Sequence, residues 1–330
     1  MAELETRRRE HDRLAAHLAA LDDEALGALL APTQAWRING LGNQSGLIEV
    51  EGTSVFVKTL ALTAVERGEA STANRFGLPM FYQYGVGSAG FGAWRELSAQ
   101  QRASQWVLSG ECPNFPLLYH WRVAPRATRP LSDELRARIQ RGVDHWEGSQ
   151  AVRARLEAIA TAPASIVLFI EAAPANLRQW LKAAGLMDAA LEAAILGIYD
   201  QWRDSAAFMN ERGMLHFDLN PDNVLTDGEK LFVADFGLTL CSDFDLSPAE
   251  RGFFEAHRSY DRAYVDGTFV RWLTGELEPP PVLTPALRAL VDRCTPVAAI
   301  FRAFLTALTQ KTKTTPYPAK ALEAAIAAQG

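Results

Sequence analysis

Residues 214–240 read MLHFDLNPDNVLTDGEKLFVADFGLTL and contain two acidic motifs. The first is HFDLNPDN at 216–223, which has the form H-x-D-x-x-x-x-N. The second is DFG at 235–237, directly after the apolar run LFVA. Short β-like runs lie between the motifs, around 223–226 and 231–234, and so the spacing predicts a β-hairpin flanked by acidic groups.

This pair of motifs closely resembles the catalytic loop and the metal-binding loop of the protein-kinase superfamily. The resemblance implies that Asp218 is the catalytic base, Asn223 a ligand of a second metal ion and Asp235 the main metal ligand. His216 would be a structural residue of the loop. Phosphoryl transfer needs these residue types, because a carboxylate must lie near the acceptor hydroxyl and oxygen atoms must hold Mg²⁺ on the phosphates. An acidic hairpin without a catalytic role is the competing interpretation.

A kinase also needs a lysine on the phosphates and a glutamate that holds this lysine. The strand-like run SVFVK (54–58) places Phe56 and Lys58 on one strand face, and the resemblance implies that Lys58 contacts the phosphates. Three glutamates are candidates for its partner: Glu66, Glu69 and Glu96. We favour Glu96, because it belongs to an amphipathic helix expected near 91–108.

The glycine-rich segment 40–46 is predicted to cover the phosphates. Its glycines, Gly40, Gly42 and Gly46, would bind the nucleotide, because glycine permits close approach of the backbone. The segment ends twelve residues before Lys58 and is one residue longer than the G-x-G-x-x-G of the family.

Residues 165–181, SIVLFIEAAPANLRQWL, resemble the strand, hinge and first large-lobe helix of the same family. The resemblance implies that Glu171 and Ala173 offer backbone groups to adenine and that Ile170 guards the back of the pocket. A helix expected over 187–212 leads into the catalytic loop.

Three features depart from the family pattern, and a fourth completes it. Phe217 replaces the arginine that receives a phosphorylated activation loop, and Asn220 replaces a lysine near the transferred phosphate. The activation segment is unusually short, because Ser247 and Glu250 predict a capping box at a helix start only a dozen residues after the DFG motif. Asp261 is a candidate for the aspartate that supports the catalytic loop.

The predicted fold is α+β with two lobes, as in protein kinases. A helical extension occupies 1–34. The N-terminal lobe, with a small antiparallel sheet and one key helix, covers 35–170 and carries insertions at about 60–90 and 125–162. A mainly helical C-terminal lobe, with a helical extension, covers 171–330.

The insertion at 125–162 and the strand before it are rich in arginine. A solvated helix face is the simpler interpretation, and a docking surface for an acidic substrate or partner protein is the sharper one. Arg7–Arg9 near the N-terminus are expected on a solvated face as well.

Composition excludes several classes of protein. The net charge of −6 argues against a general nucleic-acid binder. Three cysteines without a C-x-x-C pair and an N-terminus without an apolar segment favour a reducing, cytoplasmic location. No apolar run approaches the ~18 residues of a membrane span, so no membrane partner is expected.

A literal G-x-G-x-x-G at 85–90 suggests a dinucleotide-binding loop. Such a fold needs an acidic residue at the end of the next strand, but the next strand-like run, FPLLYHWRV (115–123), ends in arginine and valine. We therefore expect the glycines to form a flexible entry to the helix that bears Glu96, where they would let the helix swing toward Lys58 or let its N-terminal amides approach an anion.

The sequence predicts a phosphotransferase that uses ATP and Mg²⁺, with Mn²⁺ as a possible substitute, and moves the γ-phosphate to a hydroxyl. A serine or threonine of a protein or peptide is slightly favoured over a small molecule of the kind used by aminoglycoside and choline kinases. Two competing hypotheses are a nucleotide-binding pseudokinase or scaffold, and an enzyme that performs nucleotidyl transfer on the same fold.

Overall fold

The computed structural model describes residues 2–31, 36–39, 41, 43–128, 130–183, 189–276 and 283–329. It is an α+β protein with a small antiparallel sheet and a helical C-terminal region. The chain forms two compact units, which are described separately below. The N-terminal unit comprises Met1–Tyr82 and Ala89–Ala172, and the C-terminal unit comprises Gln83–Ser88 and Ala173–Gly330.

A five-stranded antiparallel sheet with the order β1-β2-β3-β5-β4 forms the centre of the N-terminal unit. Its strands are β1 (Arg37–Asn39), β2 (Asn43–Val50), β3 (Thr53–Leu62), β4 (Leu118–Pro125) and β5 (Ala164–Glu171). The predicted turn between β2 and β3 is confirmed. Glu51 and Gly52 both have positive φ, which matches the twist of a tight hairpin.

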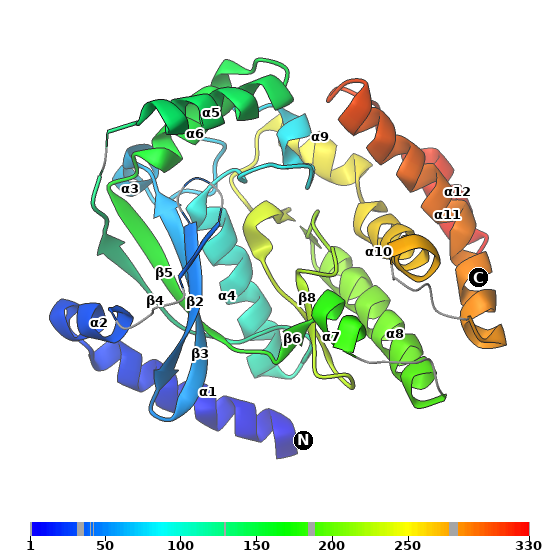
Figure 1. Ribbon diagram of the computed structural model, residues 1–330, viewed down its shortest axis with the longest axis horizontal. Helices are drawn as coiled ribbons and strands as arrows, with labels where there is room; N and C mark the ends of the chain where they lie inside the picture. The colour runs from blue at the N-terminus through cyan, green and yellow to red at the C-terminus, as the bar shows by residue number, and fades with distance from the viewer. Residues whose placement is uncertain are drawn as a thin grey trace. The chain divides into compact units, whose positions relative to one another are not determined.

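The helical segments that begin in the described part of the N-terminal unit are α1 (Ala2–Ala20), α2 (Asp23–Leu30), α3 (Ala64–Gly68), the short 3₁₀ turn η1 (Met80–Gln83), α4 (Ala93–Ser109), α5 (Asp133–His145) and α6 (Gln150–Ala160). Within this unit, α1 and α2 lie at one end of the sheet and α5 and α6 at the other (Figure 1). Leu97 of α4 packs on the sheet face formed by Leu60, Ile166 and Leu168, and this contact fixes the helix that carries Glu96.

The expectation of a solvated face at Arg7–Arg9 is wrong for two of the three arginines. Arg7 forms a bidentate ion pair with Glu171, and Arg8 donates from Nε and Nη2 to the carbonyl oxygen of Leu108. Only Arg9 is exposed. The charge pattern is misleading here because α1 packs against the rest of its unit, a tertiary contact that such a pattern does not encode.

The C-terminal unit combines short strands with long helices (Figure 1). Strands β6 (Ala175–Asn176), β8 (Val224–Thr226) and β9 (Leu231–Val233) form one sheet, and β7 (Met214–Leu215) pairs with β10 (Leu240–Cys241). The predicted hairpin between the acidic motifs is confirmed as β8 and β9.

The helices of this unit, in its described part, are α7 (Leu177–Ala183), α8 (Ala189–Glu211), α9 (Pro248–Ala256), α10 (Tyr260–Arg271), α11 (Pro285–Gln310) and α12 (Ala319–Ala327), with a 3₁₀ turn η2 (Phe236–Leu238) and a π-helical turn η3 (Trp272–Glu276). The predicted capping box at the start of α9 is confirmed, with both reciprocal hydrogen bonds between Ser247 and Glu250. Across the described ranges, we find no helix with the length and apolar character that crossing a bilayer requires.

Candidate functional site

The N-terminal unit contains a buried ion pair between Lys58 of β3 and Glu96 of α4. Lys58 Nζ lies 2.6 Å from Glu96 Oε1, and the two side chains are only 11% and 10% exposed. Each charge has lost most of its water and is stabilised by the other. The structure thus pairs Lys58 with the favoured candidate, whereas Glu69 pairs with Arg75 at the surface.

Glu66, the third candidate, holds the N-terminus of α4. Its Oε1 accepts a hydrogen bond from the Ala93 backbone N–H (2.8 Å), and its Oε2 pairs with Arg155 Nη1 (2.8 Å). Both side chains of this pair are almost completely buried, at 2% and 3% exposed. Glu66 also forms a capping box with Thr63, so the two insertions of the sequence meet at the start of the helix that carries Glu96.

The glycine-rich segment is described only in part. Gly40 and Gly42 lie outside the described residues. Gly46 lies inside β2, opposite Val57 of β3, and not in the connection that follows β1. The predicted covering segment is therefore too long at its C-terminal end, because residues from Asn43 onward already pair in the sheet.

The predicted hinge residues, Glu171 and Ala173, lie on either side of the boundary between the units, which falls after Ala172. The Glu171 N–H donates to the carbonyl oxygen of Leu117 (2.8 Å), so this group is not available to adenine. Its carboxylate binds Arg7 and accepts the Leu117 N–H. No local signal indicates this use of the Glu171 side chain, because Arg7 is 164 residues away.

In the C-terminal unit, Asp218 lies in a network of amide groups. Its Oδ1 accepts from Asn220 Nδ2 (3.0 Å) and its Oδ2 from Asn223 Nδ2 (2.9 Å). The Tyr264 side chain of α10 hydrogen-bonds to Asp218. Burial is the main cause, and the negative charge of Asp218 the second, that raises the pKa of Tyr264 far above its usual range. The phenol thus stays protonated and can donate to the carboxylate.

Asp261 supports the loop that contains Asp218, as the sequence suggested. Its carboxylate is buried and accepts two backbone N–H groups, from His216 (2.6 Å) and Phe217 (2.9 Å). Phe217 has a φ of +64°, a left-handed conformation that needs such restraint in a bulky residue. Burial raises the pKa of Asp261 to about 6, although the two N–H groups act in the opposite direction.

The two candidate metal ligands lie on linked loops. The Ala234 N–H, next to Asp235, donates to the Asn223 carbonyl oxygen (2.9 Å). Asp235 has a φ of +63° and an exposed side chain. The amide nitrogen of Asn223 is bound to Asp218, which leaves its amide oxygen as the donor atom. A carboxylate and an amide oxygen suit Mg²⁺ or Mn²⁺. Among the described residues, no three His, Cys, Asp or Glu side chains form a metal cluster.

The expectation that Gly85–Gly90 form a flexible entry to α4 is wrong for the first half of the run. Gln83–Ser88 belong to the C-terminal unit. Tyr84 is buried there, and its hydroxyl lies 2.7 Å from His257 Nε2. Gly85 lies against Asp218, since a Cβ at this position would be 2.7 Å from Asp218 Oδ1. The sequence identified the glycines but not their neighbour.

The buried His257 side chain is expected to make the stability of the protein depend on pH. Burial lowers the pKa of His257 to about 4, from an ordinary value of 6.5. Between about pH 6.5 and 4 the unfolded chain takes up a proton at this imidazole and the folded chain does not. The free energy of unfolding should therefore fall as the pH falls through this window, by on the order of 3 kcal/mol.

Urea unfolding of the wild type and of His257→Phe at several pH values measures this contribution. Asp261 acts in the opposite direction, because its pKa is raised from 3.8 to about 6 in the folded chain. It is present in both proteins, so their difference isolates His257. A variant with the same pH dependence as the wild type would contradict the assignment of a neutral, buried His257.

Two arginines of the predicted docking surface form contacts within the N-terminal unit. Arg155 pairs with Glu66, and Arg122 donates to the carbonyl oxygen of Leu21 at the end of α1. Arg136, Arg138 and Arg141 of α5 are exposed. A partner protein at 125–162 thus remains a prediction, and the exposed arginines of α5 are the residues that would contact it.

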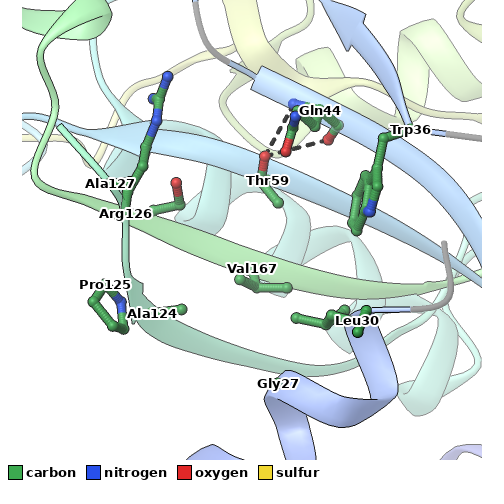
Figure 2. Close-up of a pocket in the computed structure, with 12 residues that line it drawn as sticks. Gly27, Leu30, Trp36, Gln44, Thr59, Ala124, Pro125, Arg126, Ala127 and Val167 are labelled. Atoms are coloured by element: carbon green, nitrogen blue, oxygen red, sulfur yellow. Dashed lines mark hydrogen bonds between the residues drawn. The ribbon is translucent and has the colours of Figure 1, made fainter. Parts of the chain in front are cut away.

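A pocket of about 380 Å³ lies on the face of the N-terminal sheet opposite to the Lys58 side chain. Figure 2 shows Thr59 and Val167 on the strands, the ring of Trp36 and Leu30 beside them, and the hydrogen bonds between Gln44 and Thr59. Thr59 follows Lys58 in β3, so its side chain points to the opposite face. Of the predicted site residues that the structure describes, none lines this pocket.

No protein-family model matches the chain, and the search of curated proteins returned no significant match.

Proposed function

We propose that the protein is an ATP- and Mg²⁺-dependent phosphotransferase with a protein-kinase-like fold, which moves the γ-phosphate of ATP to a hydroxyl group. The observation that carries this proposal is the buried Lys58–Glu96 pair. The sequence motifs around Asp218 and Asp235 indicate a phosphotransferase independently of that pair, and a kinase requires a lysine held in this way.

In the proposed reaction, Lys58 would bind phosphate oxygens and Glu96 would keep its ammonium group in place. The acceptor hydroxyl would form a bond to the γ-phosphorus, the bond to the β,γ-bridging oxygen would break, and ADP would leave. Asp218 would accept the hydroxyl proton. Asp235 and the amide oxygen of Asn223 would hold Mg²⁺, which neutralises charge on the phosphates.

Replacing Lys58 by methionine tests this proposal. We expect phosphate transfer from [γ-³²P]ATP into a cell extract to fall by at least ~100-fold, because one preorganised cation on the transferred phosphate is lost. Lys182→Met, at an exposed lysine of α7, is the control and should retain wild-type transfer.

Removal of Lys58 alone leaves Glu96 buried without this partner and is expected to destabilise the protein. The double variant Lys58→Met/Glu96→Met removes both charges and should recover stability but not transfer. Wild-type transfer by either variant would contradict the proposal.

A further inference from the structure

The segment Gln83–Ser88 is anchored firmly beside the candidate catalytic loop. The Gln83 side-chain amide donates to the carbonyl oxygen of Leu238, and both Gln83 and Tyr84 are buried. The Tyr84 ring packs against Phe217, Phe253, His257, Tyr260 and Phe304. A segment with these contacts is a fixed part of the C-terminal unit, although it comes from an insertion that belongs mainly to the N-terminal unit.

Gly85 brings the backbone of this segment against Asp218. A Cβ added at Gly85 would lie 2.7 Å from Asp218 Oδ1 and 3.2 Å from the carbonyl oxygen of Phe217. Real side-chain carbons do not approach other atoms at 2.7 Å, so a larger residue here would displace the Asp218 carboxylate or the segment itself. Beyond it, Val86 and Ser88 are half-buried and Gly87 is exposed with a φ of +101°.

The connection after the DFG motif is short. It consists of the turn η2, the strand β10 paired with β7, and a short link to Pro248, where α9 begins. Cys241, Phe244 and Leu246 in this connection are buried, and Ser242, Asp243 and Asp245 between them are exposed. An extended peptide is bound along an exposed strand edge or groove several residues long. Gly85 of the segment 83–88 lies against Asp218, so this segment takes up space next to the carboxylate.

We infer that Gln83–Ser88 form one wall of the acceptor site, and that the acceptor is a small hydroxyl-bearing molecule and not a serine or threonine of a protein. This inference rests on the proposed function. The sequence alone slightly favoured a protein or peptide acceptor. A small acceptor needs only one hydroxyl within reach of Asp218, and the backbone of Gly85 would limit what else fits there.

The Gly85→Ala variant tests the role of the wall. Its added carbon would lie 2.7 Å from Asp218 Oδ1, where ordinary contact begins at 3.4 Å, so the carboxylate or the segment must shift. We expect transfer to fall about 100-fold with unchanged affinity for Mg·ATP, because displacement of a reacting group by ~1 Å costs about that much. Gly68→Ala is the matched control. Gly68 lies in the same insertion, has an ordinary φ and has open space around its added carbon, so wild-type transfer is expected.

The acceptor class is tested with [γ-³²P]ATP and cell extract, separated by ultrafiltration into protein and metabolite fractions. We expect label in the metabolite fraction. Label in the protein fraction alone would overturn the inference and uphold the proposed function, and label in neither fraction would overturn both.

If Gly85→Ala fails to fold, Tyr84→Phe removes only the hydrogen bond to His257, and its expected effect is a raised KM for the metabolite fraction with unchanged KM for ATP. Wild-type kinetics in both variants would show that Gln83–Ser88 do not form part of the acceptor site.

Discussion

Replacing Asp218 by asparagine is expected to lower phosphate transfer between about 100-fold and 10,000-fold, the contribution of a positioned general base. The carboxamide has the size of the carboxylate but cannot accept the hydroxyl proton. Because Asp218 is assigned to the acceptor and not to the phosphates, the dissociation constant for Mg·ATP should stay within about twofold of wild type. Transfer rates and isothermal titration calorimetry measure the two quantities.

Asp222→Asn is the matched control for this variant. Asp222 belongs to the same loop, but its carboxylate is exposed and pairs with Arg178 at the surface. Exposed pairs contribute little, so stability and transfer should both remain near wild type. If Asp218→Asn transferred phosphate as fast as Asp222→Asn, Asp218 would not be the base.

Replacing Arg155 by methionine is expected to lower the free energy of unfolding by about 3–5 kcal/mol, the range observed when one partner of a buried ion pair is removed. The change leaves the Glu66 carboxylate buried without the guanidinium, which also donates to the carbonyl oxygen of Gly90. Urea unfolding measures the loss. Since Glu66 also binds the first turn of α4, the helix of Glu96 should loosen, and transfer should decline with stability.

Two further variants separate the charge from the packing. Arg153→Met changes a partly exposed arginine of the same helix and should cost no more than about 0.5 kcal/mol. Glu66→Gln/Arg155→Met removes both charges, keeps a hydrogen-bond acceptor for α4 and should recover most of the loss. Equal stability of Arg155→Met and Arg153→Met would contradict a structural role for the pair.

The sequence predicted those parts of the site that depend on local pattern. Strand alternation placed Lys58, helix amphipathicity favoured Glu96, and a capping-box pattern located the start of α9. The spacing of the acidic motifs predicted the β8–β9 hairpin. Each signal lies within one element or between neighbouring elements, so it can be read without knowledge of tertiary contacts.

The contacts that the sequence did not predict join residues far apart in the chain. Arg155 is one of many arginines, and only its position 89 residues from Glu66, on a helix packed nearby, makes it a partner. Gly85 was recognisable as part of a glycine run, but its steric requirement comes from Asp218, 133 residues later. The use of Arg7 by Glu171 follows from the packing of α1 in the same way.

The most direct measurement of the central claim is the identity of the products that the wild-type protein forms from ATP and Mg²⁺ in the presence of the metabolite fraction. Mass spectrometry and nucleotide chromatography should find ADP in equal amount to a product that has gained one phosphate, with Asp218→Asn forming neither. A product that carries AMP, with release of pyrophosphate, would show nucleotidyl transfer instead. ATP that is bound but remains unchanged would show a binding protein without this activity, and either result would contradict the proposed phosphotransferase.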